Sequence, residues 1–356
     1  MLTGKKEKSR YLKNKRGFHL IYFLPSRTFQ LNLHVPILVL FHCILSPFLL
    51  KKFVYTILYL SFFFQVQAQI KQVAITIDDL PNAKLYDEEV ISKLLYKLDS
   101  MRVPITVFIN EKFVDHSENG GKVMEMLEAW GRSPLVELAN HTYSHQKYSK
   151  SDLQSYQEDI LKGEKYSKEI SRVNQKPYEY IRFPYNDLGK DSIQHMQMRA
   201  WLSRQYYTIA PFTVESADWL FNSVYKHTLQ NEAPYTPQQI GQMYVDKSME
   251  LFHFFDSLSL QKYERSIPQI YLCHDNELNT DYLIPLIDSL KQEGYALVSM
   301  REALKDAAYS QEDSYFEKWG ISWFYRWMPS TEERGKWMRA EPRLEQIQSI
   351  SESIKK

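Results

Sequence analysis

The sequence predicts an α/β fold built on a parallel β-sheet. Short apolar runs rich in β-branched residues, such as 73–77 and 105–109, alternate with longer segments that have helical spacing. A strand that is apolar at successive positions is buried on both faces, as in parallel sheets that are covered by helices. With 356 residues, the chain is long enough for one large domain of this class plus a leader and appended segments.

Seven segments are expected to form the strands of this sheet. Each is a run of four or five mostly apolar residues, the pattern of a buried strand. They span residues 73–77, 105–109, 135–139, 179–183, 206–210, 269–273 and 295–298. Because parallel strands need long crossover connections, helices are expected in the segments between them.

Helical spacing does occur between most of these runs, namely at Tyr86–Asp99, Val123–Trp130, Leu153–Ser171 and Asp281–Gln292. Two regions exceed a minimal α/β domain. Residues 220–265 read as an insertion that could form one wall of a substrate groove, with a helix over Pro237–Tyr263. Residues 308–356 form an aromatic-rich extension that ends in an amphipathic helix, Glu341–Ile354. For its aromatic residues, packing is the favoured interpretation and sugar stacking is the alternative.

Two adjacent carboxylates, Asp78 and Asp79, follow the first predicted strand. In α/β folds the ligands and catalytic groups gather at the carboxyl ends of the strands. Placing two like charges together is costly unless a cation or a shared proton compensates them. A metal ion is therefore the first ligand to expect at this position.

His141 and His145 follow another predicted strand and are four residues apart. This spacing puts two imidazoles on one face of a helical turn, close enough to share an ion. Two His and one Asp, with an open position for water, is the ligand set of a catalytic zinc site. A His pair alone is weak evidence, but together with the Asp pair it predicts a metal centre.

Five short motifs occur in one order between residues 72 and 304. They are Thr76-Ile77-Asp78-Asp79, His141-Thr142-Tyr143-Ser144-His145, Arg182-Phe183-Pro184-Tyr185, Asp218-Trp219 and Leu272-Cys273-His274. Each would recur by chance, but in this order they resemble the polysaccharide deacetylase family (carbohydrate esterase family 4, the NodB homology domain). The resemblance implies a distorted (β/α) barrel of about seven parallel strands with the site at their carboxyl ends.

The resemblance also implies a role for each motif residue. Asp79, His141 and His145 would hold a divalent metal, usually Zn²⁺, with Co²⁺, Ni²⁺ or Mn²⁺ as alternatives. Asp78 would be the general base that takes a proton from the attacking water, and His274 the general acid that protonates the departing amine. These roles suit the chemistry, since amide hydrolysis needs an activated water and a proton for a poor leaving group.

The remaining motif residues would support this machinery. Arg182 would pair with Asp78 and keep it ionised, and Asp218 would orient His274 and favour its charged form. The backbone amide of Tyr185 would help to stabilise the oxyanion. Trp219 and Leu272 would line the small pocket that receives the acetyl methyl group.

Three positions differ from the family pattern. Leu80 stands where glycine is common, Asn186 replaces a glycine after Tyr185, and Glu215 stands where an Asp often lies three residues before Asp218. Leucine adopts a positive φ only at a cost, so the loop after the Asp pair is expected to have a different shape, whereas Asn tolerates that geometry. These differences bear on substrate preference more than on reaction type.

Charge is distributed unevenly along the chain. Residues 1–70 hold ten Lys or Arg and one acidic residue, so the remainder carries a formal net charge of −8 although the whole chain is at +1. An acidic catalytic portion argues against nucleic acid as a partner. The expected organisation is a leader over 1–68, a catalytic domain over 69–307 and the extension over 308–356.

The leader predicts export to the periplasm or the extracellular space. Lys51-Lys52, an apolar stretch from Phe53 to Phe64, and Val66-Gln67-Ala68 read as the three parts of a signal peptide that is cleaved after Ala68. Residues 1–49 are unusual before such a signal, and a mis-called translation start is one explanation. An uncleaved membrane anchor made from residues 36–64 is the other.

The sequence thus predicts an exported, metal-dependent hydrolase that removes N-acetyl groups from a glycan containing N-acetylglucosamine, either a cell-wall polymer or an oligosaccharide. An esterase for O-acetylated sugars such as acetylxylan would use the same mechanism and stays open. A glycan-binding protein whose site no longer turns over is a third interpretation, against which the intact base and acid candidates weigh.

Overall fold

The structure, a computed structural model, describes residues 70–82, 92–118 and 120–354, all within the compact unit Ala68–Lys356. The predicted leader, with its cleavage site and its alternative as an anchor, lies outside the described residues. Within the described ranges, no helix combines the length and the apolar character that crossing a membrane requires.

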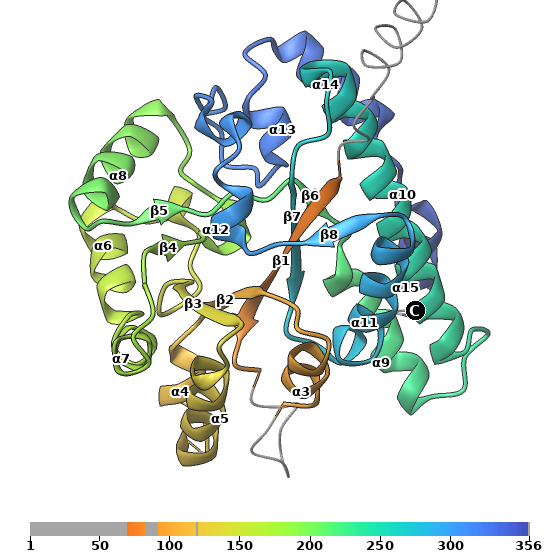
Figure 1. Ribbon diagram of the computed structural model, residues 1–356, viewed down its shortest axis with the longest axis horizontal. Coiled ribbons are helices and arrows are strands. Elements are labelled where there is room, and N and C mark those ends of the chain that lie inside the picture. The colour runs from red at the N-terminus through yellow and green to blue at the C-terminus, as the bar shows by residue number, and fades with distance from the viewer. Residues whose placement is uncertain (1–69, 83–91, 119, 355–356) are drawn as a thin grey trace, which may run out of the picture. The chain divides into compact units, whose positions relative to one another are not determined.

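A parallel sheet of eight strands forms the centre of this unit (Figure 1). The strands are β1 (Lys71–Leu80), β2 (Ile105–Ile109), β3 (Val136–Asn140), β4 (Tyr180–Ile181), β5 (Thr208–Ile209), β6 (Val214–Glu215), β7 (Gln269–His274) and β8 (Tyr295–Leu297). Their order is β5-β4-β3-β2-β1-β7-β6, and β8 pairs with the first residues of β1. The predicted parallel α/β fold and its seven strand segments are confirmed, and the structure adds the two-residue strand β6.

The sheet curls into a half-barrel, and a short connection spans its opening. Residues 210–213 lead from β5, at one end of the strand order, to β6 at the other. Ala210 donates a backbone hydrogen bond to Ile181 in β4, and Thr213 donates one to Ile270 in β7. This arrangement agrees with the distorted (β/α) barrel that the resemblance implies, and it directs the carboxyl ends of the strands toward one region.

Helices surround the sheet (Figure 1). They are α3 (Lys93–Ser100), α4 (Lys112–Asp115), α5 (Gly120–Arg132), α6 (Leu153–Lys162), α7 (Ser167–Val173), α8 (Ser192–Arg204), α9 (Asp218–Gln230), α10 (Pro237–Tyr263), α11 (Glu277–Gln292), α12 (Met300–Ala303), α13 (Trp323–Arg326), α14 (Thr331–Ala340) and α15 (Glu345–Ile354). The helix expected over Pro237–Tyr263 is α10, with a capping box at Thr236. Of the segment Tyr86–Asp99, the part described as helical begins at Lys93; residues 83–91 lie outside the described residues.

The segment expected as one helix over Leu153–Ser171 is two helices, α6 and α7, with a break that begins at Gly163. The backbone of Gly163 packs against the backbone that follows β3. A Cβ at this position would lie 2.5 Å from the carbonyl carbon of Thr142 and 2.6 Å from the amide nitrogen of Tyr143. A side chain is excluded here because the helix end lies directly against the segment that carries the two histidines.

Replacing Gly163 with Ala is therefore expected to destabilise the protein by about 1–3 kcal/mol, the usual cost of overpacking. A fall in the midpoint of thermal unfolding measures the effect. The matched control is Gly121→Ala in α5, where a Cβ would meet nothing within 4 Å. Alanine has the higher helix propensity, so this control should be neutral or slightly stabilising. Equal midpoints for both variants would contradict the close approach at Gly163.

The aromatic-rich extension supports the packing interpretation for most of its members. Among the large apolar residues between Tyr315 and Met328, those that are buried are Tyr315, Trp323, Phe324, Tyr325, Trp327 and Met328, whereas Phe316 and Trp319 are exposed. Phe324 stacks on Phe255 of α10, with ring centroids 5.6 Å apart. The extension also reaches the barrel opening, because Trp323 donates a backbone hydrogen bond to Phe212 and the Ser322 hydroxyl donates one to the Thr213 carbonyl.

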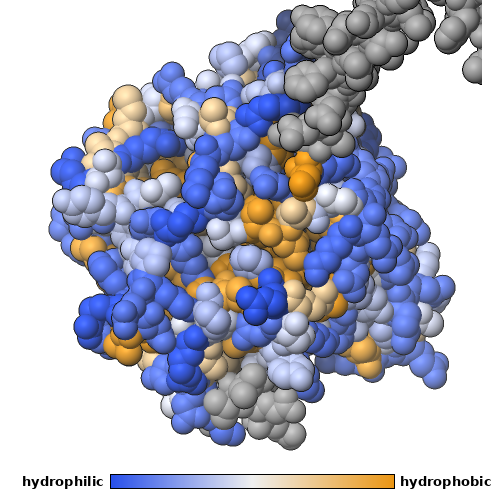
Figure 2. Space-filling view, viewed as in Figure 1, coloured by the Kyte–Doolittle hydropathy of each residue, from blue (hydrophilic) through white to orange (hydrophobic). Residues whose placement is uncertain are grey.

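The surface of the unit is mostly hydrophilic on the face seen in Figure 2, and an apolar patch lies near its centre over β1 and β8. Below the surface, the apolar residues of β1, β2 and β7 are almost completely buried. The free energy gained by burying this apolar area drives the folding of the sheet and its helices. The polar motif residues are found where these buried strands end.

Candidate active site

Asp78 and Asp79 approach the same group of residues because β1 has a bulge at this point. In its pairing with β2, Ile77 lies opposite Val107 and Leu80 lies opposite Ile109, so two residues of β1 face one of β2. Successive side chains of a regular strand point to opposite faces, and a bulge re-aims them. Asp79 has φ +62°, so the positive φ falls on the Asp itself, and Leu80 stays within the strand.

Asp79, His141 and His145 converge on one point. One ligand atom from each lies within 4.8 Å of the other two. The Nε2 atom of His145 is 3.1 Å from Oδ1 of Asp79, and the Nε2 atom of His141 is 3.5 Å from the same oxygen. The structure thus brings together the three residues that the resemblance implies as metal ligands.

The donor set fits a divalent cation. His141 Nδ1 lies 2.8 Å from the carbonyl oxygen of Arg182, and a ring nitrogen that meets a carbonyl must donate. Burial lowers the pKa of His141 and so favours the neutral ring, whose Nε2 then carries a lone pair. That lone pair faces Asp79 Oδ1, a buried oxygen without a well-oriented hydrogen-bond donor among the described residues. A cation between two such electron-rich atoms resolves their repulsion, and two His plus one Asp suit zinc.

Polar contacts that sequence patterns did not reveal hold the loop with the two histidines. The side-chain amide of Asn110, which directly follows β2, donates to the carbonyl oxygens of His141 and Thr142. Asn140 accepts a hydrogen bond from the amide of Thr142, and Asp159 of α6 accepts one from the amide of Ser144. Thr142 and His145 both have positive φ, so these contacts hold a backbone that non-glycine residues rarely adopt.

Arg182 lies fully buried beside Asp78. Its Nη1 atom donates to Asp78 Oδ1 at 2.8 Å and to the Thr76 hydroxyl at 2.7 Å, and its Nη2 atom donates to the carbonyl of Pro211. The guanidinium also packs on the ring of Phe108, 4.2 Å from its centroid. A buried carboxylate next to a fixed positive charge is compensated electrostatically. The structure thus contains the predicted contact between Arg182 and Asp78.

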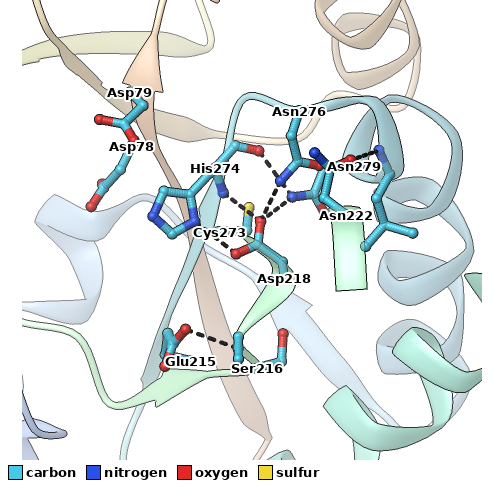
Figure 3. Close-up of polar contacts among 12 residues, drawn as sticks. Asp78, Asp79, Glu215, Ser216, Asp218, Asn222, Cys273, His274, Asn276 and Asn279 are labelled. Carbon is cyan, nitrogen blue, oxygen red and sulfur yellow. Dashed lines mark hydrogen bonds and ion pairs between the residues drawn. The ribbon is translucent and has the colours of Figure 1, made fainter. Parts of the chain in front are cut away.

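His274 lies on the other side of Asp78, next to it in the register between β1 and β7. Its Nδ1 atom is 2.7 Å from Oδ1 of Asp218, the first residue of α9. Figure 3 shows the imidazole between Asp218 and Asp78, with its second ring nitrogen on the side of Asp78. The carboxylate of Asp218 therefore fixes the orientation of the ring and leaves the other nitrogen free for proton transfer.

Asp218 is itself held by two residues that the sequence motifs did not include. Its Oδ2 atom accepts hydrogen bonds from the side-chain amides of Asn276 and Asn279 and from the backbone amide of His274 (Figure 3). The hydroxyl of Tyr244, from α10, donates to Asn279. Through Tyr244 and Asn279, the insertion thus helps to hold the His274–Asp218 pair in place. Its expected role as a wall of a substrate groove stays a prediction.

The electrostatics favour a charged imidazole. Burial lowers the pKa of His274, but the negative charge of Asp218 and its hydrogen bond outweigh this and raise the pKa to about 10. Burial and the nearby charge of Asp218 raise the pKa of Glu215 to about 7. Glu215 accepts a hydrogen bond from the Ala217 amide in the turn before α9. At neutral pH the site therefore holds a protonated histidine.

The other predicted site residues lie around this centre. Tyr185 has φ +59°, and its ring lies against that of His145, with centroids 4.8 Å apart. The next residue, Asn186, has φ +49°, as its tolerance for this geometry suggests. Trp219 is exposed next to Asp218 at the start of α9, and Leu272 is buried in β7 beside Thr76. Their roles as walls of an acetyl pocket stay predictions.

Removal of one candidate ligand side chain should strongly weaken metal binding. The wild-type protein is expected to bind one zinc ion, and His145→Ala should lower the affinity for zinc by more than about 100-fold. Loss of a residue that only hydrogen-bonds to a metal ligand costs up to about 100-fold in affinity, so loss of a ligand itself should cost more. Isothermal titration measures both affinities. His116→Ala is the matched control, since this exposed imidazole is not part of the converging cluster. Unchanged zinc affinity in His145→Ala would refute the metal centre.

Asp218 controls the protonation of His274, so Asp218→Asn should change the pH dependence of activity. Without the negative charge the imidazolium is less favoured, and the pKa of His274 falls. The acid then loses its proton at lower pH, and the alkaline limb of kcat should move toward lower pH by about 1–3 units. A pH profile of kcat, with the unfolding midpoint as a check of folding, tests this. An alkaline limb that does not move would contradict the assignment.

Comparisons with known proteins agree with the motif pattern. Residues 65–200 match the family model described as polysaccharide deacetylase. A curated relative, a peptidoglycan-N-acetylglucosamine deacetylase of Bacillus cereus, is 28% identical over 148 residues. These cover 42% of this chain and 46% of the relative, so the match spans less than half of that protein.

Two solved structures are also similar. One is the Bc1960 peptidoglycan N-acetylglucosamine deacetylase, with 21% identity, a TM-score of 0.45, and coverage of 66% of this chain and 89% of that one. The other is BA3943, a CE4 family pseudoenzyme from Bacillus anthracis, with 15% identity and a TM-score of 0.45. The second match covers 67% of this chain and 66% of that one.

Proposed function

The segment 65–200 belongs to the polysaccharide deacetylase family, and we propose that this chain is an exported, metal-dependent deacetylase of a glycan that contains N-acetylglucosamine. The observation that carries the proposal is the position of Asp78 between two charged groups. Arg182 donates to its carboxylate on one side, and His274, held by Asp218, lies on the other. The cluster of Asp79, His141 and His145 adjoins it. One base, one acid and one ligand set thus meet at a single edge of the sheet.

Asp79, His141 and His145 are the residues that would hold the metal, and Zn²⁺ suits them best, with Co²⁺, Ni²⁺ or Mn²⁺ as alternatives. A bound divalent cation supplies Lewis acidity, which polarises the acetyl carbonyl and makes water more acidic. The cluster adjoins Asp78, because the Nε2 atom of His141 lies 4.0 Å from Asp78 Oδ2. Water near the cluster is therefore within reach of the carboxylate that would take its proton.

The proton transfers are assigned to two side chains. Asp78 accepts the proton of the attacking water, since Arg182, which the Thr76 hydroxyl holds in turn, keeps its carboxylate in a fixed position. His274 then donates its proton to the nitrogen of the departing sugar amine, which is a poor leaving group unless it is protonated. With a pKa raised to about 10, the imidazole carries this proton at neutral pH. The backbone amide of Tyr185 is assigned to the oxyanion.

The substrate assignment follows the curated relative, which is a peptidoglycan-N-acetylglucosamine deacetylase. Beyond residue 70 the chain carries a formal net charge of −8. This negative charge would repel the phosphates of a nucleic acid, but it would not repel a neutral or cationic carbohydrate. Export rests on the signal-like pattern that ends at Ala68. N-terminal sequencing of the protein from its host tests this, and a retained leader would exclude cleavage there.

Acetate release by the purified protein, with and without added zinc, tests the activity. The substrates are N-acetylglucosamine oligomers, peptidoglycan and an O-acetylated xylan. Zinc-dependent release from the first two is the expected result. Release from the xylan alone would assign the protein to the esterases. Sugar binding without acetate release, in the presence of zinc, would indicate a glycan-binding protein instead.

A further inference from the structure

The C-terminal extension contacts the active-site loop that contains Tyr185. Gly320 packs so closely there that a Cβ would lie 2.2 Å from the carbonyl oxygen of Tyr185 and 2.9 Å from Cβ of Asn186. A second contact joins the extension to the helix that follows this loop, because the ring of Phe316 lies edge-on to that of His195 in α8, with centroids 5.5 Å apart. Residues 316–320 therefore form a strap along the loop that follows β4 and the start of α8.

This strap, residues 316–320, is fixed at both ends. Before Gly320, the carbonyl oxygen of Tyr315 accepts a hydrogen bond from the guanidinium of Arg326. After it, the Ser322 hydroxyl binds the carbonyl of Thr213, and Arg326 forms a buried ion pair with Asp313. The backbone at Trp319 thus has a defined place beside the loop, one residue from the contact with Tyr185.

Trp319 is the member of the aromatic cluster that packing does not explain. Its neighbours Tyr315 and Trp323 are buried, whereas Trp319 is 59% exposed. Tyr185, whose ring contacts the metal-ligand candidate His145, is also exposed, at 54%. Trp319 is joined through Gly320 to the segment of Tyr185, and exposed apolar side chains next to a candidate site are typical of a ligand-binding surface. Lysine ammonium groups lie over both rings, with Lys147 Nζ 4.5 Å from the Tyr185 centroid and Lys318 Nζ 5.0 Å from the Trp319 centroid. The remaining apolar ring surface suits the apolar face of a pyranose ring.

We propose that Trp319 and Tyr185 form an aromatic platform for the sugar that adjoins the deacetylated one, so that the extension is part of the substrate site. The proposal rests on the proposed function, since it assumes a glycan at the site. It adds that a residue of the extension, Trp319, contributes to the affinity for the neighbouring sugar, while the acetyl group is processed at the centre formed by β1 and β7.

Kinetics on substrates of different length test the platform. For the N-acetylglucosamine tetramer, Trp319→Ala should raise KM by about five- to tenfold, which is the loss of affinity expected when one aromatic contact is removed. The kcat should change little. Trp319→Phe should restore most of the affinity. For 4-nitrophenyl acetate, which has no second sugar, the kinetics should not depend on residue 319. The matched control is Tyr206→Ala, an exposed aromatic residue before β5 and so at the amino ends of the strands.

The outcomes separate this inference from the proposed function. If the wild-type protein releases acetate and Trp319→Ala has an unchanged KM for the tetramer, the platform is wrong and the activity stands. If no acetate is released, titration of the tetramer into the zinc-loaded Asp78→Asn variant still measures the platform. Equal affinity with and without Trp319 in that background overturns the inference, and a loss confined to the Trp319 variant supports it.

Discussion

Asp78→Asn is expected to lower kcat for acetate release by about 10²- to 10⁴-fold, the usual contribution of a general base. Asparagine keeps the size of the side chain and an oxygen that can accept from Arg182, but it takes no proton from water. The side chain of Asp78 provides none of the three converging ligand atoms, so the zinc affinity of Asp78→Asn should stay close to that of the wild type. Acetate assays and isothermal titration of zinc measure the two quantities on the same preparation.

The neighbouring residue supplies the matched control for this variant. Asp79→Asn changes the adjacent side chain in the same way, but it removes a predicted ligand and should lose zinc and activity together. Because Asn leaves the buried Arg182 with a weaker partner, the unfolding midpoint of Asp78→Asn must show that the variant is folded at the assay temperature. A folded Asp78→Asn with more than a tenth of the wild-type kcat, or with zinc lost, would contradict the assignment of the base.

His274→Gln is expected to lower kcat by about 10²- to 10⁴-fold for an N-acetyl substrate, and by much less for 4-nitrophenyl acetate. An amine must be protonated before it leaves, whereas a nitrophenolate leaves without a proton. The ratio of the two losses therefore reports proton donation and not the general integrity of the site. Steady-state kinetics with both substrates provide the measurement.

His227→Gln controls for loss of an imidazole elsewhere, since His227 belongs to α9 and contacts Asn231 near the end of that helix. Its kinetics should match the wild type with both substrates. If His274→Gln slows the ester and the amide equally, the residue does not act as the acid for the leaving group. Such a result would instead suit an esterase in which His274 serves to orient the substrate.

The sequence predicted the long strands that carry the site better than it predicted the short strand β6 and the exact bounds of the helices between the strands. Apolar runs such as 73–77 and 269–273 are long and buried on both faces, so their pattern is unambiguous, and both form strands of the sheet. The two-residue strand β6 has no such pattern, since two residues cannot show a period. The break at Gly163 depends on a contact with Thr142, twenty-one positions earlier, which helical spacing does not reveal.

In the candidate site too, some residues could be predicted from the sequence and others could be found only in the structure. Motif residues could be identified because their order and residue types are specific, and seven of them meet through short contacts between charged or polar atoms. Asn276 and Asn279, which hold Asp218, belong to no motif and are found only through the fold. The strap that contains Trp319 lies more than a hundred residues from Tyr185 in sequence, and no local pattern connects them.

By itself, the sequence determined the class of fold, the ligand candidates and the candidates for base and acid. These depend on residue type and on local periodicity, which are properties of the chain before it folds. Only the tertiary structure decided that a bulge in β1 turns two adjacent carboxylates toward one centre, and that the extension reaches the active-site loop. Both depend on contacts between segments distant in sequence, whose geometry is set by packing and by strand register.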